Sequence, residues 1–137
     1  MIVETDPDLR RLLQENRVIA MVGLSANVTR PSHVVARYLM AHGYTVIPVN
    51  PVELEILGQP CYARLADIPV KVDVVDCFRK SADILPIARE AIDIGARVLW
   101  MQQEVINPEA ARMAVEAGLE VVMDRCIKID HARLLGA

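Results

Sequence analysis

The side chains that could act as nucleophiles or bases are few and far apart along the chain. His33, His42 and His131 have no serine or cysteine at a spacing that would bring the two groups together, so no nucleophile and base pair can be recognised. The three cysteines are an odd number, without a Cys-x-x-Cys pair or a histidine cluster at metal-ligand spacing. These residue types favour a binding protein without a metal over an enzyme that acts alone.

A loop of small and hydroxyl residues, 23–30, follows the first apolar run of the sequence. A turn of this kind between a strand and a helix directs backbone N–H groups and the positive end of the helix toward a phosphate. Ser25, Arg30 and Ser32 could contact the phosphate oxygens. The loop contains one glycine where the dinucleotide fingerprint has three, and it lacks the spacing and the lysine of a P-loop. An ordinary turn is therefore the alternative interpretation.

The second apolar run ends in Asn50 and Pro51. An NAD site would have an aspartate or glutamate here to bind the ribose 2′-hydroxyl group. A neutral strand end with arginines nearby suits a ligand that carries an additional ribose phosphate. Both NADP and coenzyme A (CoA) have such a phosphate, and this position does not distinguish them.

Three further side chains have both a functional and a structural interpretation. Cys126 has a cationic residue on either side, which favours a thiolate and a mixed disulfide with a thiol ligand, whereas packing is the alternative. Asp73 and Asp76 interrupt an apolar run. We expect these two carboxylates to pair with arginines, and a polar end to a binding cleft is the alternative.

Apolar runs alternate with segments of helical period along nearly the whole chain. The apolar runs predict strands at residues 17–23, 44–49, 70–78, 97–101 and 119–123. Start signals predict helices that begin near Thr5, Pro31, Asp83 and Asn107, and a single helical turn is expected at residues 65–68. Strands that alternate with helices imply right-handed crossovers and a parallel sheet. We therefore predict an α/β fold, a Rossmann-like doubly wound parallel sheet of about five strands with helices on both faces, as a single domain over residues 1–137.

Composition excludes several classes of protein. The 137 residues are 53% hydrophobic and 24% charged, which is too apolar for a disordered chain. A net charge of −3 and 4% aromatic residues argue against a nucleic-acid partner. The N-terminus lacks the basic and apolar regions of a signal peptide, and no apolar run is long enough to cross a membrane. We expect a cytoplasmic protein that does not associate with membranes.

Six short motifs together carry a family resemblance. The sequence resembles the small CoA-binding proteins whose domain is similar to the N-terminal CoA-binding domain of the succinyl-CoA synthetase alpha subunit. The resemblance extends from about Arg17 to Lys128. The motifs lie at residues 22–25, 30–32, 46–51, 72–79, 99–102 and 121–126.

The resemblance implies a binding site at the strand ends. The loop that contains Ser25 and Ser32 would hold the CoA pyrophosphate, with Arg30 as an anchor, and Asn50 and Pro51 would border the adenosine. Arg79 and residues 100–102 would line the path of the pantetheine arm. The complete set of expected CoA-binding residues is Gly23, Ser25, Ala26, Arg30, Ser32, Asn50, Pro51, Phe78, Arg79, Trp100, Met101 and Gln102.

The leading hypothesis is non-catalytic binding of CoA or an acyl-CoA at the carboxyl ends of the parallel strands. The synthetase carries its phosphorylated histidine on a second domain, for which the 137 residues leave no room, so ligase chemistry is not expected here. An NADP-type regulatory domain is one alternative, disfavoured because the glycine-rich fingerprint is absent. An accessory subunit that docks on a separate acyl-CoA ligase is another. A homodimer is expected for a domain this apolar.

Overall fold

The computed structural model describes residues 1–136, in which strands and helices alternate as the sequence predicts. The strands of the main sheet are β1 (Val18–Val22), β2 (Thr45–Val49), β5 (Val74–Cys77), β6 (Val98–Met101) and β7 (Glu120–Val122). The α-helices are α1 (Asp6–Glu15), α2 (Pro31–Ala41), α3 (Ile84–Asp93), α4 (Pro108–Glu116) and α5 (Ile127–Leu134). Short elements between them are β3 (Glu55–Ile56), β4 (Gln59–Pro60) and the 3₁₀ turns η1 (Leu65–Asp67) and η2 (Ser81–Asp83).

Within residues 1–136, five strands form one sheet in the order β2-β1-β5-β6-β7, and every pair of neighbours is parallel. This is the flavodoxin-like variant of the doubly wound arrangement. The α/β fold class and the Rossmann-like sheet predicted from the sequence are confirmed.

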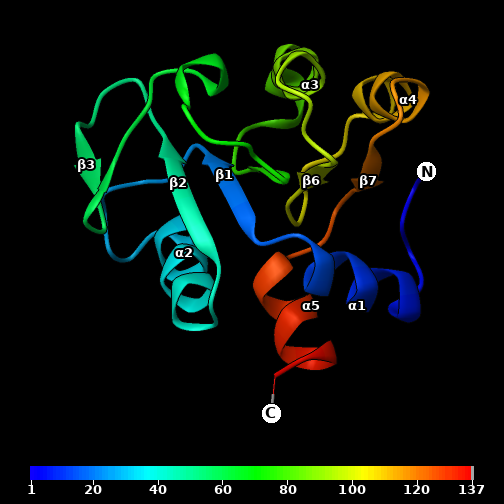
Figure 1. Cartoon of the computed structure of the whole chain (residues 1–137), viewed down its shortest axis with the longest axis horizontal. Helices are drawn as coiled ribbons and strands as arrows, with labels where there is room; N and C mark the ends of the chain where they lie inside the picture. The colour runs from blue at the N-terminus through cyan, green and yellow to red at the C-terminus, as the bar shows by residue number, and fades with distance from the viewer. Residues whose placement is uncertain (137) are drawn as a thin grey trace.

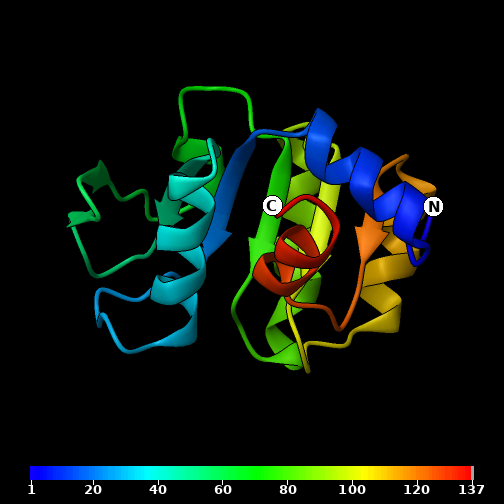
Figure 2. The same ribbon diagram turned by 90° about the horizontal axis from the view of Figure 1, so that it is seen from below.

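Helices cover both faces of the sheet (Figure 1). Helices α3 and α4 lie on one face, where their alanines and isoleucines pack on Val75, Leu99 and Val121. Helices α1, α2 and α5 lie on the other face, as the view from below shows (Figure 2). There Met21 and Trp100 belong to the second half of the core. Each strand is thus buried on both sides, which explains the continuous apolar runs of the sequence.

The helices begin where local chemistry favours it. The Thr5 hydroxyl oxygen accepts a hydrogen bond from the Asp8 N–H at 3.4 Å and caps α1. The Asn107 side chain accepts one from the Ala110 N–H at 3.0 Å and caps α4. Pro31 and Pro108 occupy the first positions of α2 and α4, where no intrahelical N–H is needed.

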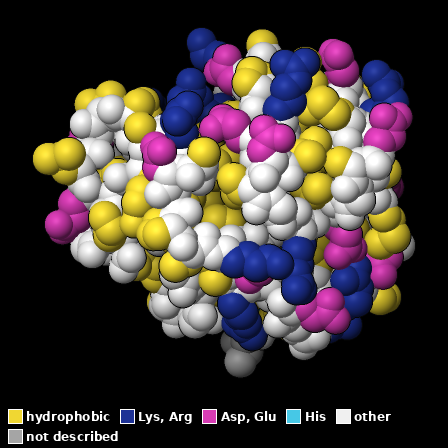
Figure 3. All heavy atoms as spheres, turned by 45° about the horizontal axis from the view of Figure 1, so that its top comes forward, with side chains coloured by type: hydrophobic (Ala, Val, Ile, Leu, Met, Phe, Trp, Pro, Cys, Tyr) yellow, Lys and Arg dark blue, Asp and Glu magenta, His cyan; other side chains and the backbone are white. Residues whose placement is uncertain are grey.

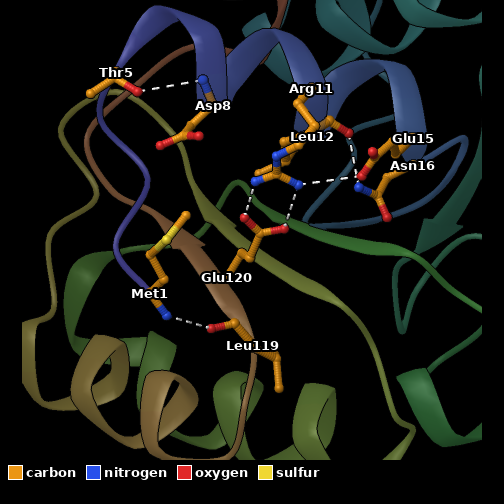
Figure 4. A network of polar contacts seen from close by, with 9 residues as sticks. All are labelled: Met1, Thr5, Asp8, Arg11, Leu12, Glu15, Asn16, Leu119 and Glu120. Carbon is orange, nitrogen blue, oxygen red and sulfur yellow. Dashed lines mark hydrogen bonds and ion pairs between the residues drawn. The ribbon is translucent and has the colours of Figure 1, made fainter.

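The N-terminal segment fastens α1 to the outer strand β7 (Figure 4). The Val3 N–H donates to the Val121 carbonyl at 2.8 Å, and the Met1 amino group donates to the Leu119 carbonyl at 3.1 Å. The Arg11 guanidinium binds the Glu120 carboxylate with two nitrogens. These contacts cover a sheet edge that would otherwise present unpaired backbone groups.

Three local features differ from the sequence prediction. Residues 127–134 form α5, although the sequence predicts only a short tail after Cys126. The third main strand is β5, four residues long, where residues 70–78 were expected. Pro48 lacks an N–H, so the sequence predicts it where the ladder ends; it lies inside β2, one residue before the end, and β2 tolerates it because β2 is an edge strand of the sheet.

Basic and acidic side chains are interspersed over the face seen in Figure 3 and do not gather into a basic patch there. The described helices include none that is long and apolar enough to cross a membrane.

Candidate functional site

The order of the strands marks one place on the sheet for a ligand. The chain leaves β1 through α2 to reach β2 on one side, and it leaves β5 through α3 to reach β6 on the other. Ligands of open parallel sheets bind outside the carboxyl ends of the strands, where the order reverses in this way. The loops after β1 and β5 therefore border the candidate site.

Gly23 brings these two loops together. Its φ angle is +88°, and a Cβ at this position would lie 2.3 Å from the Phe78 carbonyl oxygen and 2.9 Å from the Arg79 Cδ atom. Only glycine fits both the left-handed backbone and this close approach. The ends of β1 and β5 consequently form one continuous surface beside the candidate site.

The loop after β1 is held by its own hydroxyl groups. The Ser25 N–H donates to the Ser32 Oγ atom at 3.0 Å, which ties the loop to the first turn of α2. The Ser25 Oγ atom accepts from the Asn27 N–H at 3.1 Å. Ser32 is buried, whereas Ala26 is exposed. The two serines expected to contact phosphate thus also fix the shape of the loop that would surround it.

The N-terminus of α2 lies beside this loop. Arg30 is its N-cap residue, and within residues 1–136 no side chain accepts a hydrogen bond as its cap. Arg30 is exposed, and its guanidinium pairs with none of the carboxylates that the structure describes. Pro31 has no N–H and the His33 and Val34 N–H groups donate to the Arg30 carbonyl, so the attraction of this helix start for an anion comes mainly from the helix dipole and the nearby free cation.

Asn50 connects the ends of β1 and β2. Its side-chain amide donates to the Leu24 carbonyl at 3.0 Å, and its oxygen accepts from the Val52 N–H at 2.8 Å. Pro51 is exposed and borders a cleft of about 320 Å³, whose charged lining residues include Arg64 and Arg79. Asn50 therefore shapes the adenosine side of the expected site, and Pro51 faces it.

A larger cleft, of about 840 Å³, opens at the ends of β5 and β6. Arg79 lies at the junction of the two clefts and forms an ion pair with Asp83 at 3.7 Å. The rim of the larger cleft therefore carries both positive and negative side chains. The residues that line this cleft are Pro31, Val35, Phe78, Arg79, Lys80, Asp83, Gln102, Gln103, Glu104, Val105 and Cys126.

Three expected site residues at the end of β6 have different positions. Gln102 is buried, lines the large cleft and accepts a hydrogen bond from the Ile127 N–H at 3.3 Å. Trp100 and Met101 are fully buried and do not line this cleft. The Trp100 indole N–H donates to the Arg125 carbonyl at 2.7 Å. Trp100 thereby supports the loop at the far end of the cleft from within the core.

Cys126 lies at that far end, as the N-cap residue of α5. Its thiol is half-buried and free. The neighbouring loops meet where the Glu104 N–H donates to the Asp124 carboxylate at 2.7 Å, and both residues have positive φ angles. This hydrogen bond joins the loop after β6 to the loop after β7, which carries Cys126.

The two aspartates near β5 do not pair with arginine side chains, so that expectation is wrong. The Asp73 carboxylate accepts from the backbone N–H groups of Arg17 and Val18, at 3.1 and 3.0 Å. Asp76 is fully buried between Met21 and Trp100 of the flanking strands, and among the described residues neither of its oxygens has a hydrogen-bond partner. Burial raises the pKa of Asp76 well above its ordinary value of 3.8.

Several lining residues were not among those expected from the sequence. Val35 is an apolar helix residue and so gives no signal of a binding site, and the sequence left Cys126 as either a reactive thiol or a packing residue. Pro31, Lys80 and Gln103 directly follow an expected residue, and Asp83, Glu104 and Val105 lie two to four residues after one. The additional lining residues are Pro31, Val35, Lys80, Asp83, Gln103, Glu104, Val105 and Cys126.

Residues 17–132 match the model of a family described as a CoA binding domain. The chain belongs to this family. The resemblance found in the sequence is therefore confirmed.

Relatives of this CoA-binding domain protein include both small proteins and parts of large enzymes. It is 40% identical to the Bacillus subtilis protein YneT over 125 residues, 91% of this chain and 93% of that protein. It is 26% identical to an ADP-forming acetate–CoA ligase of Archaeoglobus fulgidus, across 81% of this chain but 18% of the ligase. Its sequence is thus homologous to one part of such a ligase.

Solved structures agree with this relationship. A hypothetical protein of Pyrococcus horikoshii superimposes with a TM-score of 0.95 at 44% identity, over 97% of this chain and 94% of that one. A dinucleotide-forming acetyl-CoA synthetase of Candidatus Korarchaeum cryptofilum superimposes with a TM-score of 0.70 at 25% identity, over 80% of this chain and 27% of that one. The CoA-binding domain fold thus occurs in proteins of very different length.

Proposed function

We propose that this protein binds CoA or an acyl-CoA without transforming it. The observation that carries the proposal is the pair of connected clefts at the strand-order reversal, which meet at Arg79 beside the uncapped start of α2. In this proposal the pyrophosphate lies against the loop of Ser25 and Ser32, and the adenosine lies by Asn50 and Pro51. Membership of the family supports the choice of ligand.

The pantetheine arm occupies the large cleft in this proposal. Phe78 and Val35 offer it an apolar surface, and Gln102 and Gln103 offer amide groups to its two peptide-like bonds. The cleft ends at Cys126, which places the CoA sulfur near that residue. Of the twelve residues expected from the sequence, Trp100 and Met101 do not contact the ligand in this proposal. They support, from within the core, the loops that the ligand contacts.

The absence of catalysis is part of the proposal. His33, His42 and His131 are not among the residues that line the two clefts within the described chain, so Cys126 has no histidine base there.

Three free cysteines suit the reducing cytoplasm. We also expect a homodimer, which light scattering after size-exclusion chromatography will test.

Isothermal titration of the reduced protein with CoA, dephospho-CoA and NADP tests the ligand. CoA is expected to bind at micromolar or tighter affinity, dephospho-CoA more weakly and NADP not detectably. Binding of NADP without CoA would replace the proposal with the regulatory NADP domain.

An accessory role in a ligase is the second candidate, because the Archaeoglobus fulgidus enzyme contains a homologous segment within a longer chain. Affinity purification from the native host, followed by mass spectrometry, tests it. Recovery of a ligase subunit in stoichiometric amount would support the accessory role. If the protein also showed no detectable binding of CoA, the accessory role would become the leading explanation.

A further inference from the structure

A second groove continues from the thiol end of the large cleft. It has a volume of about 650 Å³ and lies between α2 and α5, which pack side by side on the same face of the sheet (Figure 2). Pro31, Val35 and Cys126 line both the cleft and the groove. A molecule that leaves the cleft past Cys126 therefore enters the groove directly.

The groove has the lining of a site for hydrocarbon. Val34 and Val35 contribute from α2, and Ile129 and Ala132 contribute from α5. Ile129 is 55% exposed, although it is a large apolar side chain. Covering such a surface with an apolar chain removes it from water and stabilises the complex.

Two cations lie at the groove, and the guanidinium of one of them is already paired. Arg133 already pairs with Asp6 at 2.8 Å and with Asp130 at 3.2 Å. The Lys128 ammonium lies 5.7 Å from the centre of the Tyr38 ring. The apolar side chains of the lining, rather than its cations, therefore favour an aliphatic acyl chain.

We propose that this groove binds the acyl chain of a medium-chain fatty acyl-CoA, with the thioester beside Cys126. The inference rests on the proposed function, because it takes the CoA sulfur to lie at the end of the large cleft. It adds the class of acyl group, which the cleft alone does not select.

Titration with CoA, acetyl-CoA and octanoyl-CoA tests the inference. Octanoyl-CoA is expected to bind at least tenfold more tightly than CoA, and acetyl-CoA about as tightly as CoA. Equal affinities for CoA and octanoyl-CoA would overturn the acyl groove and leave the proposed function intact. Failure of CoA and octanoyl-CoA alike to bind would instead overturn the proposed function.

Two variants localise the effect. Ala132→Trp fills the groove from an exposed position of α5, and Ile129→Asn makes its wall polar. Each is expected to remove most of the preference for octanoyl-CoA while CoA affinity stays within twofold. Val70→Asn is the matched control for Ile129→Asn, because Val70 is also 55% exposed and lies outside the groove.

The rate at which iodoacetamide alkylates Cys126 gives a second measurement, followed by mass spectrometry of the peptide. Octanoyl-CoA is expected to protect this thiol more than CoA does. If Ala132→Trp still prefers octanoyl-CoA to the same extent, a different surface binds the acyl chain. If the substitution changes the oligomeric state instead, a second copy of the protein covers the groove. Either result would overturn the inference.

Discussion

The carbonyl oxygen of Phe78 lies 2.3 Å from the point that a Cβ on Gly23 would occupy. Backbone pairing holds the end of β1 against the end of β5 at the strand-order reversal, where the Phe78 N–H donates to the Val22 carbonyl at 2.9 Å. No side chain can enter there without moving backbone that also carries Arg79. Gly23 therefore determines the shape of the loop after β1, to which the proposed function assigns the pyrophosphate.

Gly23→Ala is predicted to abolish measurable CoA binding and to destabilise the protein. The left-handed backbone alone costs an L-residue about 1–2 kcal/mol, and the contact with Phe78 adds to that. Thermal unfolding and CoA titration measure the two effects. Gly58→Ala is the control, because Gly58 also has a positive φ of +75° but has no atom within 4 Å of a Cβ. Equal behaviour of the two variants would show that the close approach has no role.

The sequence predicted the sheet because each of its strands is buried on both faces and so appears as an apolar run. It missed α5 for a local reason. Cys126 provides no side-chain cap, and Asp130 and His131, polar residues that would ordinarily face water, are both buried. Asp130 is paired with Arg125 at 2.7 Å and with Arg133, so tertiary ion pairs stabilise a helix that the pattern of apolar residues does not indicate.

The sequence predicted that the candidate site lies at the carboxyl ends of the strands. It did not predict which of the side chains there reach the cleft. Trp100 lies in β6 and is used inside the core, whereas Gln102, directly after β6, reaches the cleft. The groove beside Ile129 depends on how α2 and α5 pack. Such helix packing has no signal in the local sequence.

Arg30→Ala is predicted to weaken CoA binding by about 1–3 kcal/mol, as expected for the loss of a charge-assisted hydrogen bond. Arg30 is at the N-cap of α2 and has no carboxylate partner within residues 1–136, so its removal leaves the fold intact. Titration at two salt concentrations measures the effect. Arg112→Ala on α4 is the control, since Arg112 is exposed and does not line either cleft. Unchanged affinity in Arg30→Ala would remove this residue from the site.

Asp76→Asn is predicted to stabilise the protein at neutral and alkaline pH. The pKa of Asp76 is raised in the folded state, which therefore binds its proton more tightly than the unfolded state does. The contribution of Asp76 to the free energy of unfolding is fully present below about pH 3.8 and is lost as the pH rises above that value. The variant cannot ionise, so its advantage over the wild-type protein grows with pH as the wild-type carboxyl group loses this contribution to stability.

Urea unfolding of the wild-type protein and Asp76→Asn at pH 5 and pH 8 measures this difference. Asp73→Asn serves as the comparison, because the Asp73 carboxylate accepts two backbone hydrogen bonds and its neutralisation should destabilise the protein. A constant difference between the wild-type protein and Asp76→Asn across this pH range would contradict an ionisable buried carboxyl group.

Acidification is predicted to loosen the packing of α5 on α2 through His131. This buried ring accepts or donates a hydrogen bond at 2.8 Å with the Tyr38 hydroxyl group, and the rings of His42 and Tyr44 lie against it. Burial lowers its pKa below 6.5, and the charges of His42 and Arg17 lower it further. The unfolded state therefore binds the proton more tightly, and stability is full above about pH 6.5 and lost as the pH falls below it.

Urea unfolding at pH 5.5 and pH 7.5 is expected to show a lower midpoint at the acidic pH, and His131→Gln is expected to reduce that difference. Burial and Arg37 also lower the pKa of His33, so part of the pH dependence should remain in the variant. His33→Gln measures that remainder. If octanoyl-CoA binds between α2 and α5, its affinity should fall at pH 5.5 more than that of CoA, because the acyl chain lies between the two helices, whereas CoA meets them only at Pro31, Val35 and Cys126.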